Sequence, residues 1–104
     1  MENREEKKGY VKPNVKGYRN LTEEDVALMN ELKELGETIE TALYKVMAHV
    51  EKCRATEGLS EINKVIEYER LDRATPERFL ALAKTNMQTG LMQAIRAVAQ
   101  PDSF

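Results

Sequence analysis

Apolar residues follow a helical spacing along much of the chain. From Leu28 to Cys53 they recur in alternating steps of four and three, the spacing of a coiled-coil seam. This seam consists of Leu28, Leu32, Leu35, Ile39, Ala42, Val46, His49 and Cys53. It is widened by Met29, Leu43, Met47 and Val50. A stripe of this breadth predicts a long helix that contacts more than one neighbour.

A second long helix is predicted from about Pro76 to Ala99. Thr75-Pro76-Glu77 is a helix start, because Thr can cap, Pro suits the first helical position and Glu favours the first turn. The seam of this helix is Leu80, Ala83, Met87, Leu91, Ala94 and Val98. At about 100° per residue, other apolar side chains point well away from the seam. These are Phe79, Leu82, Met92 and Ile95. A hairpin alone leaves such a helix with too few neighbours, so we predict a homo-oligomer.

The remaining signals complete an all-α prediction. Thr22, followed by three acids, starts the first long helix, Gly58 stops it, and Ser60 begins a short helix to about Leu71. Residues 9–20 contain Pro, Gly and Asn without a helical period. We therefore expect a helical hairpin of two long antiparallel helices, with a short additional helix, that assembles into a homo-oligomeric bundle. Residues 1–16 form a flexible or extended N-terminal arm, and residues 17–104 form a single hairpin domain.

Charge and cysteine content narrow the function. The 104 residues carry a net charge of −2, yet residues 1–20 carry +3 and residues 84–104 carry +1. A fold that brings the two ends together would create a local anion site in an acidic protein. Neither long helix has a basic face, so neither DNA nor RNA is an expected partner, and no membrane is expected. One cysteine and no long apolar run indicate a reducing cytoplasm.

The sequence predicts no catalytic residue, no metal site and no cofactor. One histidine and one cysteine cannot form an ordinary zinc site within a chain. Catalytic triad, phosphate-loop and dinucleotide-binding motifs do not occur in the sequence. We expect His49 to occupy a packed or interface position on its seam. The protein is therefore predicted not to be an enzyme.

Three groups of residues suggest ligand binding instead. Tyr18 and Arg19 offer a stacking ring and a forked cation to a nucleotide-like ligand. The alternative is that Tyr18 only staples the arm onto the helix start. Lys33, half-buried on the shoulder of the apolar stripe near Gly36, could meet a phosphate that needs backbone clearance. The alternative is a lysine that extends toward water and pairs with Glu37.

The third group lies between Lys84 and Arg96 in the second long helix. Thr85, Thr89 and Arg96 share one strip of the helix, while Lys84 and Gln88 share a neighbouring strip. Threonine and glycine are poor residues for a helix interior, so a small polar anion held between helices would account for them. The alternative is close helix packing at Gly90, with each threonine bonding back to its own helix.

Two segments resemble the phage anti-CBASS and anti-Thoeris hairpin family. They are Gly17-Tyr18-Arg19-Asn20-Leu21-Thr22-Glu23-Glu24-Asp25 and Ala83-Lys84-Thr85-Asn86-Met87-Gln88-Thr89-Gly90-Leu91-Met92. The resemblance implies a hairpin that assembles into a compact oligomer, a hexamer, and sequesters cyclic nucleotide immune signals without degrading them. The implied ligands are cyclic dinucleotides or trinucleotides of CBASS and cyclic ADP-ribose isomers of Thoeris. It also implies that Tyr18 stacks on a base, that Lys33 contacts phosphate, and that Thr85 and its neighbours supply polar contacts.

Another class of function fits the same apolar faces. A structural or adaptor hairpin would use them to bind protein partners. The two functions differ in one simple respect, because only the sequestering protein binds a cyclic nucleotide.

Overall fold

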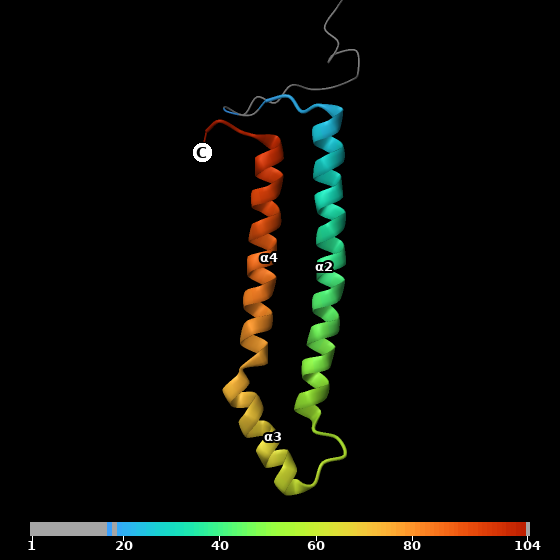
Figure 1. Cartoon of the computed structure of the whole chain (residues 1–104), viewed down its shortest axis with the longest axis vertical. Coiled ribbons are helices and arrows are strands. Elements are labelled where there is room, and N and C mark those ends of the chain that lie inside the picture. The colour runs from blue at the N-terminus through green and yellow to red at the C-terminus, as the bar shows by residue number, and fades with distance from the viewer. Residues whose placement is uncertain (1–16, 18, 104) are drawn as a thin grey trace, which may run out of the picture.

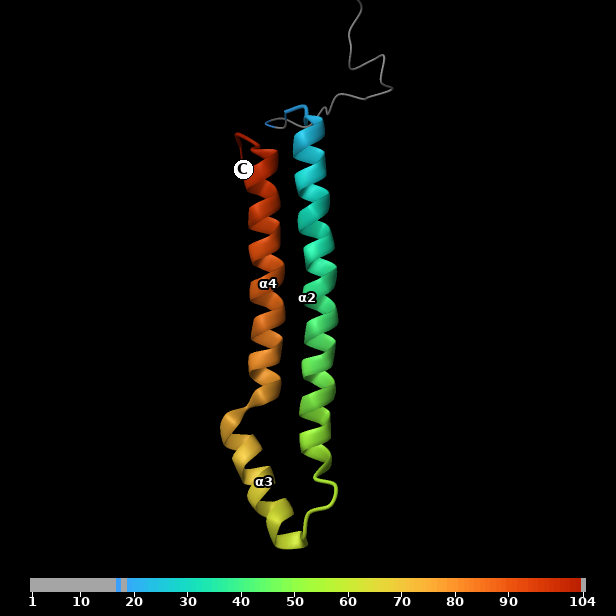
Figure 2. The same cartoon turned by 45° about the vertical axis from the view of Figure 1, so that its right-hand side comes forward.

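The structure is a computed structural model that describes residues 17 and 19–103. It consists of three helices, α2 (Glu23–Ala55), α3 (Glu61–Ala74) and α4 (Pro76–Ala99). Within the described residues there is no strand. α2 and α4 lie side by side and antiparallel, and α3 bends away from the start of α4 beyond the end of α2 (Figures 1 and 2). The all-α hairpin with a short additional helix is thus confirmed, while the predictions for residues 1–16 and Tyr18 lie outside the described residues.

The start of α2 is held by the residues that the sequence indicated. The Asp25 amide donates to the Thr22 hydroxyl over 3.0 Å, and the Thr22 amide donates to the Asp25 carboxylate over 2.9 Å. This reciprocal capping box satisfies two amides that have no partner within the helix. α2 ends at Ala55, because Thr56 adopts a left-handed conformation with φ of 52°. The helix therefore stops before Gly58, which lies in the following turn.

One residue separates α3 from α4. Thr75 has a left-handed φ of 46° and serves as the C-cap of α3 and the N-cap of α4. Its amide donates to the Leu71 carbonyl, but its side chain makes no capping hydrogen bond. The predicted hydroxyl cap is therefore wrong, although α4 begins at Pro76 as expected. Proline tolerates this start because the first helical position needs no amide donor.

The face of α2 that meets α4 differs from the predicted seam. The partly or fully buried apolar residues of this face are Met29, Leu32, Ile39, Leu43 and Val50, with Gly36 among them. Leu28, Leu35 and Val46 of the predicted seam are instead 44%, 49% and 45% exposed. At 100° per residue, the observed contact row lies roughly 70° around the helix from the predicted one. Gly36 accounts for the shift, because Leu91 of α4 packs where a side chain would otherwise project.

α4 follows its predicted seam more closely. Leu80, Ala83, Leu91, Ala94 and Val98 are partly buried, whereas Met87 is 42% exposed. The sequence placed four other apolar residues of α4 away from this seam, and three of them are exposed. Phe79, Leu82 and Met92 are 60%, 43% and 70% exposed, while Ile95 is partly buried. α4 therefore carries apolar surface on sides that α2 does not cover.

The packed core of the single chain is small. Among the described residues only two apolar residues are buried, Val50 at 8% and Leu71 at 3% exposed. His49, predicted to be packed or at an interface, is exposed in the single chain. In the described part of the chain, no helix is both long enough and apolar enough to span a membrane.

Leu71 should make an unusually large contribution to stability. Replacing Leu71 with Ala is expected to lower the free energy of unfolding by about 2–4 kcal/mol, because it leaves a cavity in a buried site. Leu59→Ala removes the same atoms from a side chain that is 39% exposed and should cost less than about 1 kcal/mol. Denaturant unfolding followed by circular dichroism, at one protein concentration, measures both. Equal losses at the two positions would contradict the burial assigned to Leu71.

Candidate functional site

An open groove of about 740 Å³ runs along one side of the hairpin between α2 and α4. Its α2 wall extends from Lys33 to Glu51, and its α4 wall extends from Glu77 to Leu91. Apolar side chains form its floor, and charged or amide side chains line its edges. The apolar residues lining it are Ile39, Leu43, Met47, Val50, Leu80 and Leu91. An apolar surface with a few polar groups is typical of a ligand or partner site.

Gly36 allows the two helices to approach closely at the groove. A Cβ atom at this position would lie 3.1 Å from Cδ1 of Leu91, closer than an ordinary contact. The clearance that the sequence suggested for a phosphate is therefore used by helix packing. Gly90, in contrast, has open space around it, so the predicted close packing there does not occur within the single chain.

Two lysines face the groove from different helices. Lys33 lines its α2 wall, and Lys84 with Gln88 lines its α4 wall. All three are exposed, so Lys33 is not half-buried in the single chain as predicted. Within the described part of the chain, neither lysine forms an ion pair, and the alternative Lys33–Glu37 pair is not formed. Both ammonium groups are therefore available to an anion.

Carboxylates also line the groove. Glu37 and Glu40 lie on the same wall as Lys33, and Glu51 and Glu77 lie toward the α3 end. The first two offset the positive charge of the two lysines, while Glu77 is already paired within the chain. An anion in the groove would consequently sit nearer to Lys33, Lys84 and Gln88 than to Glu51.

An arginine clamp, formed by Arg54 with Glu77 and Asp72, lies at the α3 end of the groove. Arg54 donates to both carboxylate oxygens of Glu77, over 2.6 and 2.8 Å, and to Asp72 over 3.1 Å. The hydrogen bond with Arg54 is the main reason that the pKa of Glu77 is lowered to about 2. The same bonds, first to Glu77 and then to Asp72, raise the pKa of Arg54. One side chain thus joins the end of α2 to α3 and to the start of α4.

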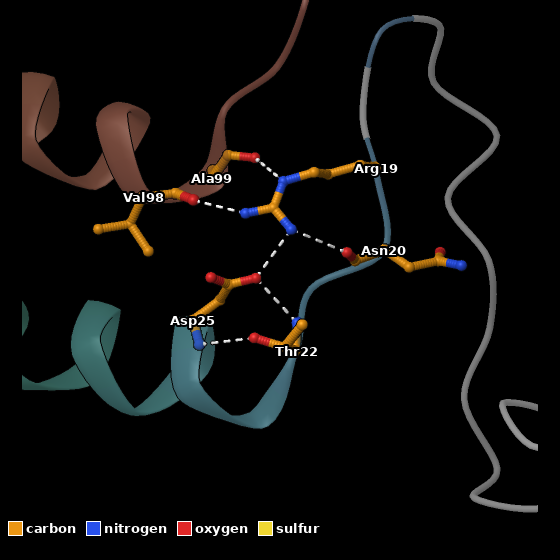
Figure 3. A network of polar contacts seen from close by, with 6 residues as sticks. All are labelled: Arg19, Asn20, Thr22, Asp25, Val98 and Ala99. Carbon is orange, nitrogen blue, oxygen red and sulfur yellow. Dashed lines mark hydrogen bonds and ion pairs between the residues drawn. The ribbon is translucent and has the colours of Figure 1, made fainter.

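Arg19 makes a similar joint at the other end of the hairpin (Figure 3). Its Nε donates to the Ala99 carbonyl over 2.9 Å, and its NH2 group donates to the Val98 carbonyl over 2.7 Å. Its NH1 group donates to the Asp25 carboxylate over 2.8 Å and to the Asn20 carbonyl over 3.2 Å. These bonds link the last carbonyls of α4 to the first turn of α2. Arg19, expected to bind a ligand, is thus occupied in joining the helix ends.

The structure divides the predicted site residues into groups. Lys33, Gly36, Lys84 and Gln88 lie together along the groove. Thr85, Thr89 and Arg96 fall on a strip of α4 that does not line it, roughly 60–100° around the helix from Gln88. Neither threonine bonds back to its own helix, although Thr38 and Thr41 of α2 do. Tyr18 lies outside the described residues.

The sequence prediction chose only Lys33 as a site residue from one row of the groove. Lys33, Glu37, Glu40, Tyr44 and Met47 follow one another along α2 in steps of four and three and line the groove together. That spacing is visible in the sequence, next to the apolar seam, but its mixed charge resembles an ordinary solvated face. Tyr44, 59% exposed, adds an aromatic ring to this row.

The histidine and the cysteine lie outside the groove lining. Nε2 of His49 is 3.8 Å from Sγ of Cys53, one turn further along α2. No cluster of three or more metal-binding side chains occurs in the described ranges.

Comparison with known proteins shows one family over this region. The family profile described as the Acb2/Tad1 hairpin domain matches residues 12–99. The chain is also similar to a protein of Pseudomonas phage JBD67 named Anti-CBASS protein 2, with 34% identity over 99 residues. The similarity covers 85% of this chain and 92% of the phage protein. The family match extends over both helices that build the groove.

Protonation of Glu77 should release the clamp. Because the pKa of Glu77 is lowered from 4.5 to about 2 in the fold, its contribution to stability is present above about pH 4.5 and is lost as the pH falls toward 2. Glu77→Gln should therefore unfold at a lower temperature than the wild type near pH 7, and the difference should shrink between about pH 5 and pH 2. Thermal unfolding curves across this range provide the measurement.

Glu61→Gln is the matched control for this variant. Glu61 lies in the first turn of α3, is nearly fully exposed and forms an ion pair with Lys64 at 3.6 Å. Its substitution should change the unfolding temperature little at any pH. A Glu77→Gln effect that is independent of pH would contradict the assigned ion pair.

Proposed function

Because the chain belongs to the Acb2/Tad1 hairpin family, we propose that it is a phage anti-defence protein that sequesters cyclic nucleotide immune signals. The match over residues 12–99 carries the proposal, and the name of the JBD67 relative supports the choice of CBASS as the opposed system. Sequestration means tight, reversible binding without cleavage. The ligands are cyclic dinucleotides or trinucleotides, with cyclic ADP-ribose isomers as a further class. The site of action is the cytoplasm of the infected bacterial cell.

The groove offers chemistry that suits such a ligand. A cyclic nucleotide combines flat apolar bases with negatively charged phosphates. The apolar floor and Tyr44 offer packing and stacking surface to a base. Lys33 and Lys84 offer unpaired cations to phosphate from opposite walls, and Gln88 offers an amide that can donate and accept. Tyr18 is proposed as an additional stacking residue.

A second copy of the chain completes the proposed site. The groove is open along its length, and exposed apolar residues such as Phe79 and Met92 remain uncovered by the single chain. We propose that hairpins pack together as a homo-oligomer, a hexamer, which covers these faces and encloses the ligand. Thr85, Thr89 and Arg96 face away from the groove and form a second polar strip, which such packing would also enclose.

Binding should appear as thermal stabilisation. A panel of cyclic GMP–AMP, cyclic di-AMP, cyclic tri-AMP and cyclic ADP-ribose isomers is added to the protein, with linear dinucleotides as the control. A ligand at a hundred times its Kd should stabilise the fold by about 2.7 kcal/mol. Mass spectrometry after denaturation should recover that ligand intact, and sedimentation should give the mass of an oligomer.

Each other outcome contradicts a stated part of this proposal. No stabilisation by any member of the panel would rule out sequestration and favour an adaptor hairpin that binds proteins. Cleaved ligand would make the protein an enzyme. A monomer in solution would rule out enclosure by a second copy.

Charge variants locate the anion in the groove. Lys33→Glu should weaken binding of the stabilising nucleotide more than tenfold with the oligomer intact, whereas Lys45→Glu, the same charge change on the opposite side of α2, should not. Glu40→Gln should strengthen binding roughly two- to fivefold, because it removes a repulsion across several ångströms. Glu34→Gln, a carboxylate outside the groove lining, is its control. Titration calorimetry measures all four, and equal effects within either pair would place the ligand elsewhere.

A further inference from the structure

Arg19 connects two helix ends that are far apart in the sequence. Its guanidinium donates to the carbonyls of Val98 and Ala99 and to the carboxylate of Asp25. The last carbonyls of a helix have no partners within it, so these bonds satisfy groups that otherwise need water. A nearby backbone bond, from the Asp102 amide to the Gly17 carbonyl over 2.9 Å, ties the same two segments.

The donors of Arg19 are nearly all in use. A guanidinium has five N–H groups, and the side chain makes four hydrogen bonds. Binding a phosphate with two parallel bonds would require breaking at least one of them. Hydrogen bonding to Arg19 is also the largest cause of the lowering of the Asp25 pKa to about 2, so this ion pair persists at neutral pH. Arg19 is therefore poorly placed to contact a ligand, in contrast to Lys33 and Lys84.

The groove depends on the relative position of α2 and α4. Its two lysines come from different helices, and the single chain buries few side chains that could fix the helices against sliding. Arg54 fixes them at the α3 end. Lys33 lies ten residues after Glu23, about 15 Å along α2 from the opposite end. Arg19 supplies the corresponding side-chain joint at that end.

We propose that Arg19 is a positioning residue, which holds α2 and α4 in register so that Lys33 of α2 and Lys84 with Gln88 of α4 line one groove. This role rests on the proposed function. Arg19 supports ligand binding without contacting the ligand. Only a fork can reach two successive carbonyls and a carboxylate together, so lysine, a point charge with the same sign, cannot replace it. Loss of the joint lowers the population of the binding-competent register and weakens binding in proportion.

Arg19→Lys tests the proposal against a matched control. Arg70→Lys also removes a forked guanidinium, which bonds to Glu67 in α3. This position is far along the chain from the two helix ends that Arg19 joins. The first readout needs no ligand. Hydrogen exchange of the Asp102 amide, followed by NMR, should accelerate at least tenfold in Arg19→Lys and stay unchanged in Arg70→Lys. Unchanged exchange of the Asp102 amide in both variants would contradict the joint that Arg19 makes between α2 and α4.

The second readout is binding of cyclic GMP–AMP, with cyclic ADP-ribose as a further probe, well below the unfolding temperature. Arg19→Lys should raise the Kd at least tenfold with the oligomer intact, and Arg70→Lys should not. Faster exchange with an unchanged Kd would make Arg19 merely structural. A higher Kd with unchanged exchange would make it a ligand contact, again against the proposal. If the wild type binds neither these probes nor any nucleotide of the panel, the proposed function fails, and the exchange result still decides whether the joint exists.

Discussion

The close contact between Gly36 and Leu91 favours the side of α2 that faces α4. Two helices that differ in length by nine residues meet along a single row, and the missing side chain at position 36 decides which side of α2 faces α4. That choice buries one part of a broad apolar stripe and leaves another part exposed. It also places Lys33 and Lys84 on the same side of the hairpin. The groove and the uncovered apolar faces therefore both follow from which side of α2 packs against α4.

Such a contact row is too thin to specify helix register by itself. Apolar side chains that are only partly buried contribute in proportion to the area they remove from water, and sliding one helix past another changes that area little. Directional polar bonds resist sliding much better. The chain places arginine forks at both ends of the hairpin, Arg54 beside Glu77 and Asp72, and Arg19 beside Asp25 and the last carbonyls of α4. Each fork joins groups from different helices.

The sequence predicted the helices better than the contacts between them. Local signals set the helix boundaries, as with Thr22 and Pro76, and these are confirmed. The seam of α4 is mostly confirmed because its apolar positions repeat regularly. The contact row of α2 could not be chosen in the same way, since its stripe is wide enough to offer several, and the choice depends on Leu91, distant in sequence. The same limit applies to the site. Lys33, Lys84 and Gln88 could be proposed one by one, but their common groove, and the use of Arg19 as a joint, depend on contacts between α2 and α4.

The charge of the groove bears on how the proposed binding of an anion would gain affinity. The chain carries a net charge of −2, and Glu37 and Glu40 lie beside the two lysines, so long-range attraction of a phosphate is weak. In an open groove, water would also screen each ammonium. If a second hairpin covers the groove, water is excluded and the same lysines interact more strongly with phosphate. The bases of the ligand are then in contact with apolar surface from both hairpins. Affinity then depends on slow release from an enclosed site more than on fast capture, which is the behaviour that sequestration requires.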